Sequence, residues 1–284
     1  MGTAGLIDIK RRVKSVENTR KITRAMGLVA TSKLKKARRE LLIDEENLEL
    51  NREIFTKVIS LIDEDYQSAY FGDKISSDTK LYIVVTSDTG LCGGFNGNVA
   101  NYIKNNLAED KENVKMIVLG AKGTSYMKKL GFTNMLELVE LSDLPTIKEV
   151  RSVYQRAKYL FLKGDVSEVN IVYTEYISPM KQEVTTERLL PLERIYGEAK
   201  DIVIEPNIKY VLDVSIERYL RSKLRRDLLH SKVSEQSARR DAMDSATRNA
   251  NELLKTLNLR YNRLRQSMIT QEISEIVGGA EAQK

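Results

Sequence analysis

The sequence has few of the residues on which metal and thiol chemistry depend. Its 284 residues include one cysteine, Cys92, and one histidine, His230. A single cysteine excludes an internal disulfide and a cysteine-based zinc cluster, and a single histidine excludes the usual multi-histidine metal sites. Apolar runs such as Leu81–Val85 extend over only a handful of residues, so no segment is expected to span a bilayer. We therefore expect a soluble protein of a reducing compartment that binds no metal or cofactor of its own.

Glycine and proline are distributed unevenly. Neither residue occurs between Gly27 and Gly72 or between Pro206 and Gly278, whereas ten glycines and all four prolines lie from Gly72 to Pro206. Because both residues interrupt helices, this distribution predicts a long helix at each end and a loop-rich centre. At about 1.5 Å per residue, the C-terminal stretch would extend roughly 100 Å. The predicted segments are an N-terminal helix over 1–71, a central domain over 72–206 and a C-terminal helix over 207–284.

The N-terminal segment has the heptad spacing of a coiled coil. Asp44 and Asn51 interrupt one of its two apolar positions and are expected to weaken the seam locally. The heptad residues are Leu34, Leu41, Leu48, Phe55 and Ile62 at one position and Ala30, Ala37 and Val58 at the other.

The C-terminal segment has an apolar face of its own, and the two helices are predicted to pair. The first runs toward the central domain and the last runs away from it, so the pair is antiparallel, and the longer last helix overhangs. Two independent amphipathic helices would leave this length unexplained. The predicted C-terminal face comprises Ala238, Ala242, Ala246, Ala250, Leu253, Leu257, Leu264 and Met268. The overhanging apolar tip comprises Ile269, Ile273, Ile276 and Val277, and Gly278–Gly279 are expected to end the helix.

The centre alternates strand and helix patterns. Strands are predicted at Leu81–Thr86, Lys115–Leu119 and Glu168–Tyr176, with a helix around Thr146–Lys163. This alternation is typical of a small sheet of parallel strands. The predicted fold class is therefore α/β, with a Rossmann-like central domain and a long antiparallel coiled coil.

No motif in the sequence satisfies the requirements of a catalytic site. The glycine-rich segment Ser87–Gly97 follows a strand but lacks the lysine and the spacing of phosphate-binding loops, as does Gly120–Thr124. Asp88–Gly90 resembles an aspartic-protease triplet, but the second triplet is missing. Cys92 has no nearby histidine to activate it, and His230 lies alone on the last helix, where packing explains it. A tight strand-to-helix turn is the favoured interpretation of the glycine-rich segment, with a nucleotide-binding enzyme as an alternative.

Charge is strongly segregated along the chain. Residues 1–39 hold twelve Lys and Arg against Asp8 and Glu17, whereas residues 40–71 hold two basic residues against nine acids. Such a basic excess implies an acidic partner. A nucleic acid fits, although no aromatic interleaving or recognisable binding module accompanies the basic stretches. An acidic protein surface fits equally well.

Three separated motifs, in order, resemble the gamma subunit family of the F-type rotary ATP synthase. They cover most of the chain. The N-terminal motif is Ile9–Val13, Asn18–Met26 and Val29–Leu34, and the central motif is Ser87–Asp88 with Gly90–Asn96. The C-terminal motif is Ser234–Arg239, Ala242–Met243, Ala246–Thr247, Tyr261–Arg263, Arg265–Gln266 and Ile269–Val277.

The resemblance implies a rotor shaft without catalytic residues. In the family, the coiled coil stands inside a ring of alpha and beta subunits that hold ATP, ADP and Mg²⁺, and the α/β domain lies near the epsilon subunit and the membrane c-ring. The expected location is peripheral, at the cytoplasmic side of the cell membrane, with membrane contact only through partners and no nucleic acid. A basic coiled-coil protein that binds nucleic acid is the alternative.

The resemblance also assigns contact residues. Met26, Arg239, Gln266, Thr270 and Glu272 match contacts to the catalytic beta subunits, Glu205 matches a foot contact near the c-ring, and Ile269, Ile273, Ile276 and Val277 match a tip in an apolar bearing. Gly27 departs from the family pattern beside Met26, and a glycine there costs about 1 kcal/mol of helix stability relative to alanine.

Overall fold

The chain forms two compact units, each with its own packing. A computed structural model describes residues 2–62, 66–72, 77–107, 109–133, 135–138, 141–194 and 204–281. One unit combines residues 31–238, and the other combines residues 1–30 with residues 239–284. The two terminal helices, α1 (Gly2–Ile59) and α5 (Ile208–Glu281), each contribute to both units.

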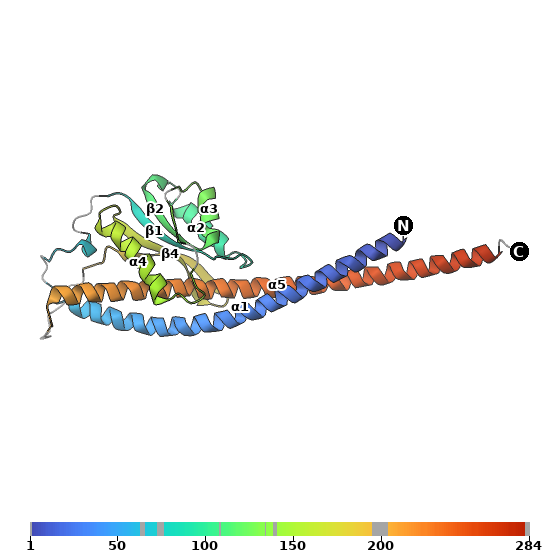
Figure 1. Cartoon of the computed structure of the whole chain (residues 1–284), viewed down its shortest axis with the longest axis horizontal. Helices are drawn as coiled ribbons and strands as arrows, with labels where there is room; N and C mark the ends of the chain where they lie inside the picture. The colour runs from blue at the N-terminus through green and yellow to red at the C-terminus, as the bar shows by residue number, and fades with distance from the viewer. Residues whose placement is uncertain are drawn as a thin grey trace. The chain divides into compact units, whose positions relative to one another are not determined.

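The larger unit contains a five-stranded sheet in the order β3-β2-β1-β4-β5 (Figure 1). Its strands are β1 (Lys80–Val85), β2 (Val114–Leu119), β3 (Met135–Leu138), β4 (Glu168–Ser178) and β5 (Lys181–Leu190). The three predicted strands, β1, β2 and β4, are parallel, as expected. The sequence patterns miss the parallel strand β3 and also β5, which pairs with β4 as an antiparallel hairpin.

The two faces of the sheet bury separate apolar clusters. Successive residues of a strand point to opposite faces, so β1 directs Leu81, Ile83 and Val85 into one cluster and Tyr82 and Val84 into the other. The first cluster joins the sheet to the terminal helices and to α4, and the second joins it to α2 and α3. These helices are α2 (Phe95–Leu107), α3 (Ala121–Lys129) and α4 (Ile147–Leu162), with short 3-10 helices η1 (Ala69–Phe71) and η2 (Lys111–Asn113).

In the larger unit, α1 and α5 are antiparallel, as predicted. Asp44 contacts Arg225, and the ring of Phe55 stacks on Tyr219 at a centroid distance of 4.9 Å. The predicted heptad residues from Leu34 to Val58 are buried on α1. On α5 a four-residue step supplies the buried side chains, which are Leu212, Ile216, Leu220, Leu224 and Leu228.

Asp44 interrupts the heptad seam at a buried position. Its side chain pairs with Arg225, which also lies 3.4 Å from Glu40 and donates to the carbonyl of Pro145 at 3.2 Å. Burial raises the pKa of Asp44, although Arg225 opposes the shift. The predicted weakening of the seam by Asp44 stays a prediction.

Three details of the terminal helices correct the sequence-based expectations. Helix α1 ends at Ile59, where no glycine or proline marks the boundary. On α5, Leu254 is the buried residue, whereas Leu253 is 43% exposed. Helix α5 continues through Gly278 and Gly279 to Glu281, so the two glycines do not end it. A glycine accepts helical dihedrals at a cost of about 1 kcal/mol, and neither adopts the left-handed conformation of a helix stop.

Candidate contact surface on the paired helix ends

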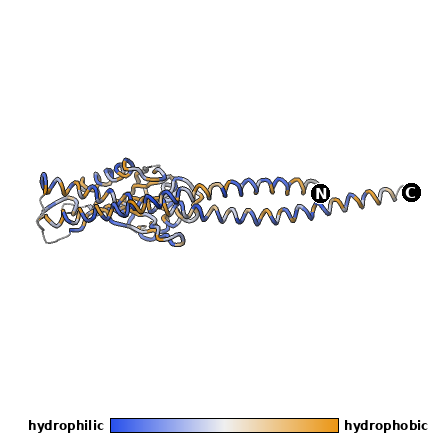
Figure 2. Tube along the Cα trace, turned by 90° about the horizontal axis from the view of Figure 1, so that it is seen from below, coloured by the Kyte–Doolittle hydropathy of each residue, from blue (hydrophilic) through white to orange (hydrophobic). Residues whose placement is uncertain are grey.

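Most of the contact residues implied by the resemblance lie in the smaller unit. There the first part of α1 and the last part of α5 run antiparallel, with polar contacts that set their register. The hydroxyls of Thr23 and Thr247 lie 2.8 Å apart, and Arg20 donates to the side-chain oxygen of Asn251 at 3.4 Å. The tube in Figure 2 shows apolar and polar residues alternating along both helices of this unit. Its buried apolar side chains are Ile9, Ala30, Met243, Ala250, Leu254 and Leu257.

Gly27 allows the two helices to approach closely beside Met26. A Cβ atom built on Gly27 would lie 3.3 Å from Oδ1 of Asp244 and 3.6 Å from the Cβ atom of Met243. Met26 itself is half-buried. An alanine at this position would require the Asp244 side chain to shift by a few tenths of an ångström.

The implied polar contact residues do not form one cluster. Gln266, Thr270 and Glu272 are exposed near the end of α5, and the Thr270 hydroxyl donates to the backbone oxygen of Gln266 at 3.0 Å. Arg239 lies about seven helical turns earlier and is buried, with 7% of its surface exposed. Contact of these residues with beta subunits stays a prediction.

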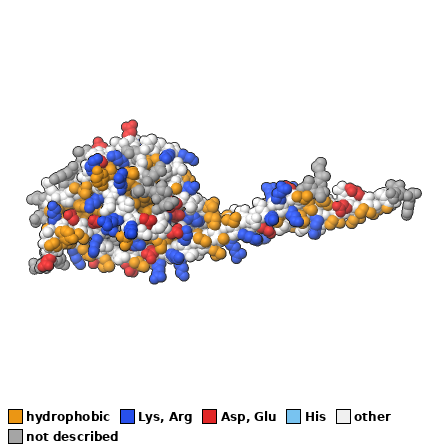
Figure 3. Space-filling view, in the orientation of Figure 1, with side chains coloured by type: hydrophobic (Ala, Val, Ile, Leu, Met, Phe, Trp, Pro, Cys, Tyr) orange, Lys and Arg blue, Asp and Glu red, His pale blue; other side chains and the backbone are white. Residues whose placement is uncertain are grey.

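The apolar tip of α5 is exposed on the isolated chain. Ile269, Ile273, Ile276 and Val277 are between 48% and 72% exposed. Every residue from 269 to 280 is exposed, because α5 continues beyond the part that α1 covers. In Figure 3, hydrophobic side chains line one edge of this end of α5. An exposed apolar row of this kind is typical of a surface that binds a partner.

Basic side chains gather on the same unit. Residues 1–30 carry seven Lys and Arg against Asp8 and Glu17. Lys10, Arg11 and Arg12 are exposed, and Figure 3 shows Lys and Arg side chains spread along the paired helices. The charge therefore forms a diffuse girdle rather than a pocket.

Glu205 belongs to the larger unit. It is exposed in the bend before Pro206, just ahead of the first residue of α5. Its implied contact near the c-ring stays a prediction.

The glycine-rich segment 87–97 is a closed turn. The backbone N–H of Ser87 donates to the side-chain oxygen of Asn96 at 3.0 Å, and the Asn96 amide donates to the Ser87 hydroxyl at 2.7 Å and to the Cys92 sulfur at 3.4 Å. Cys92 is 2% exposed. This geometry favours the predicted strand-to-helix turn over a phosphate-binding loop, whose N–H groups point outward to a ligand.

The sequence patterns miss a polar, buried segment of α5. Residues 227–237 are all buried, and several of them bond to strand β4. The N–H of Thr174 donates to the Ser231 hydroxyl at 3.0 Å, and the Ser234 hydroxyl donates to the Thr174 oxygen at 3.1 Å. The run Ser-Lys-Val-Ser-Glu-Gln-Ser has no helical apolar period, so nothing in the sequence indicates that it is buried.

His230 belongs to this buried segment and is neutral. Its Nδ1 accepts a hydrogen bond from the N–H of Tyr176 at 3.2 Å, so its proton is on Nε2, 3.6 Å from the Glu45 carboxylate. Burial, together with the charge of Arg226, lowers the pKa of His230 to about 4. The single histidine is thus a packed core residue, as the sequence analysis favours.

In the described part of the chain, no three His, Cys, Asp or Glu side chains are grouped to hold a metal ion. No helix among the described residues is both long and apolar enough to cross a membrane.

Comparisons with known proteins identify the family of this helix-pair and α/β-domain architecture. Residues 5–283 match the ATP synthase family. The chain is 51% identical over 284 residues to the ATP synthase gamma chain of Clostridium botulinum (strain Eklund 17B / Type B), with all of both chains covered. It is 46% identical over 283 residues to that of Clostridium beijerinckii, again over the whole of both chains. The chain belongs to the family of ATP synthase gamma chains.

A solved structure shares the fold. A chain of the Euglena gracilis mitochondrial ATP synthase, in an OSCP/F1/c-ring assembly, matches with a TM-score of 0.72 at 16% identity, covering 99% of this chain and 95% of that chain. None of these similarities supports the nucleic-acid-binding alternative.

Proposed function

We propose that this chain is the non-catalytic central shaft of an F-type ATP synthase. It couples ion-driven rotation of a membrane c-ring to conformational change in a ring of alpha and beta subunits, which bind ATP, ADP and Mg²⁺. Its α/β domain lies near the epsilon subunit, and the chain is peripheral to the cell membrane on the cytoplasmic side. Membership of the gamma chain family supports this proposal, as does the fold shared with a chain of a solved ATP synthase.

The observation that carries the proposal is the uncovered end of α5. A helix with Ile269, Ile273, Ile276 and Val277 exposed on one chain needs an apolar surface from elsewhere. A rotating contact also cannot depend on one fixed ion pair. Exposed pairs contribute only about 0–1 kcal/mol each, so the diffuse basic girdle can exchange acidic partners as the shaft turns.

Replacement of the tip side chains tests the proposal. In one variant, all four apolar tip residues become serine, and in a second, residues 266–284 are removed. We expect weaker co-purification with alpha and beta subunits and reduced ATP-driven ion transport in membrane vesicles.

The matched control replaces four apolar residues of α1 that are similarly exposed, namely Leu42, Ile43, Leu50 and Ile54. Serine at these positions should leave both measurements close to those of the unmodified chain. Unchanged complex formation and transport in the tip variants would contradict the role of the tip. Equal losses in the control would show that exposed apolar area, rather than this end of α5, is what the assembly needs.

A further inference from the structure

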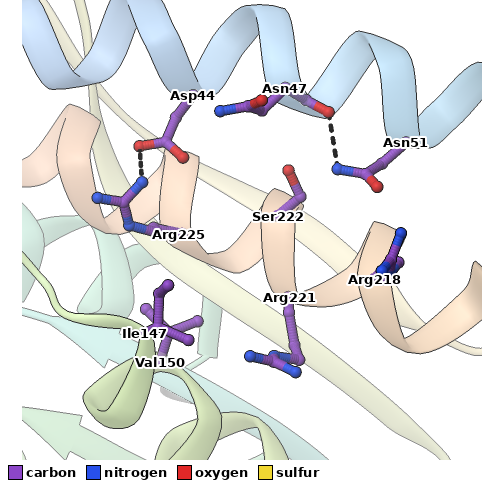
Figure 4. A pocket seen from close by; sticks show the side chains of 9 residues that line it. All are labelled: Asp44, Asn47, Asn51, Ile147, Val150, Arg218, Arg221, Ser222 and Arg225. Atoms are coloured by element: carbon purple, nitrogen blue, oxygen red, sulfur yellow. Dashed lines mark hydrogen bonds and ion pairs between the residues drawn. The ribbon is translucent and has the colours of Figure 1, made fainter. Parts of the chain in front are cut away.

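A cavity of about 500 Å³ lies between α1, α4 and α5 in the larger unit. Figure 4 shows residues of all three helices lining the same space. Its lining is Asp44, Asn47, Asn51, Ile147, Val150, Arg218, Arg221, Ser222 and Arg225.

The one carboxylate of this lining is already neutralised. Asp44 pairs with Arg225, and Arg225 also lies 3.4 Å from Glu40 outside the cavity. These three charged side chains form an ion-pair network that links α1 to α5. It leaves neither Asp44 nor Arg225 free to set the charge of the cavity.

Arg218 and Arg221 give the cavity its positive charge. Arg218 is exposed and forms no ion pair with any residue that the structure describes. Arg221 lies 3.4 Å from Glu217, but that carboxylate also faces Lys158 at 4.0 Å. Arg221 and Lys158 thus share the Glu217 carboxylate, whereas Arg218 has no carboxylate partner among the described residues.

The guanidinium of Arg221 is also incompletely bonded. Its Nε atom is buried and has no hydrogen-bond acceptor among the described atoms. An unpaired buried donor costs about 1–3 kcal/mol. An oxyanion within reach of this Nε atom would satisfy the donor.

The other side chains complete a mixed site. Ser222 contributes a hydroxyl, and Asn47 and Asn51 contribute amides from α1, with the Asn51 amide donating to the backbone oxygen of Asn47 at 2.7 Å. Ile147 and Val150 form an apolar wall from α4, and Ile147 is 66% exposed. Ligand sites in proteins commonly occupy about 300–1,000 Å³ and combine an apolar wall with a few polar groups.

We propose that this cavity binds a phosphate-bearing small anion. Arginine forks match phosphate oxygens in pairs, and Arg218 and Arg221, three residues apart on α5, both line the cavity. The apolar wall takes the organic part of a phosphorylated compound, whereas inorganic phosphates use the arginines alone.

Calorimetry on the full chain tests this site with three probes. We expect inorganic pyrophosphate and ADP to bind and adenosine, which has no phosphate, not to bind. Tighter binding of ADP than of pyrophosphate, with the difference lost in Ile147→Ser, identifies a phosphorylated organic ligand. Equal binding of the two identifies the inorganic anion.

Variants place the binding in this cavity. Arg218→Gln should weaken both phosphate probes about tenfold or more, the loss expected for one charge-assisted hydrogen bond. Because Arg218 is exposed and unpaired among described residues, this variant keeps the fold, whereas Arg221→Gln also removes a contact to Glu217. Arg151→Gln is the matched control, since it removes the same charge from an exposed position of α4 outside the cavity.

Three results would overturn the proposal. One is the absence of binding by pyrophosphate and ADP at millimolar concentration. Another is equal weakening by the Arg218 and Arg151 variants, which would show non-specific charge attraction. The third is tighter binding of a poly-glutamate peptide than of pyrophosphate, which would show that the cavity takes an acidic protein segment instead.

Discussion

His230 should make the larger unit sensitive to mild acid. The residue is 7% exposed, and its Nδ1 must stay unprotonated to accept the hydrogen bond from Tyr176. Arg226 and Asp227 on α5, Glu187 on β5 and Glu45 on α1 are the charged groups around it. Burial and the charge of Arg226 lower the pKa of His230, and the charge of Glu187 raises it.

The size of the effect follows from the pKa. The unfolded chain protonates His230 near pH 6.5, whereas the folded chain does so near pH 4. Between these values the unfolded state binds more protons, so stability is lost as pH falls through the window. A difference of that size corresponds to about 3 kcal/mol in full and about 2 kcal/mol between pH 7.5 and pH 5.

His230→Asn should remove this sensitivity. The asparagine oxygen can occupy the position of Nδ1 and accept the Tyr176 N–H, but it does not titrate. Urea denaturation of the full chain at pH 7.5, 6 and 5 measures the slope, and amide hydrogen exchange at Tyr176 reports on the local bond. The variant is less stable at pH 7.5 because it loses ring packing, but it lacks the loss of about 2 kcal/mol that His230 contributes between pH 7.5 and pH 5.

The comparison with the variant isolates His230 from its neighbours. It is the one histidine of the chain, so no other imidazole titrates in this window. Asp227 acts in the opposite direction, since burial outweighs Arg226 and raises its pKa to about 7, which favours the folded state at lower pH. Equal pH slopes for the unmodified chain and His230→Asn would refute the reasoning.

Two further predictions concern local geometry and are checked by urea denaturation. Thr146→Ala breaks the capping box of α4, in which Thr146 accepts from the Glu149 N–H at 3.3 Å, and should cost about 1 kcal/mol. Burial alone would raise the pKa of Glu149, but hydrogen bonds from Thr146 and Ser142 lower it to about 2. The stabilisation by the Glu149 carboxylate is therefore present above about pH 4.5 and lost as the pH falls toward 2. Gly123→Ala places a Cβ atom 2.4 Å from the Thr86 hydroxyl and should cost about 1–3 kcal/mol, whereas Gly97→Ala, with no described atom within 4 Å, should not. Equal stability of each altered protein and its reference would contradict these assignments.

The helices could be predicted where the sequence marks their limits. Pro206 precedes α5 by two residues, and the long stretch without glycine or proline that follows is helical. The end of α1 at Ile59 has no such mark, because the chain leaves the helix through turns at residues 60–62 that any residue type permits. At Gly278 the sequence predicts a helix end that the structure does not have, since a glycine permits a helix to end but does not enforce it.

The strands, too, could be predicted only where the sequence marks them. The apolar strands β1 and β2 are buried on both faces and stand out in the sequence. Strand β5 is mostly polar and half-exposed, and its extended form depends on pairing with β4. Pairing with a neighbouring strand leaves no apolar period in a polar strand.

The candidate contact residues came from resemblance rather than from physical pattern. Exposed residues such as Gln266 and Glu272 differ in no local property from other polar residues of a helix. The apolar tip is the exception, because a row of exposed isoleucines violates the ordinary preference for burial. The buried polar segment of α5 could not be predicted, since its partners, Thr174 and Tyr176, come from a distant strand.

That buried segment has a mechanical consequence for the proposed shaft. One helix, α5, carries both the exposed tip and the stretch at residues 227–237 that is enclosed on every side. Apolar contacts alone would let an enclosed helix slide or turn, because the hydrophobic effect has no direction. The hydrogen bonds of Ser231 and Ser234 to the two backbone groups of Thr174 do have direction, and they fix the rotation of α5 against β4. A torque applied along the helix is therefore resisted by directional bonds in the domain, which is the property that a shaft requires.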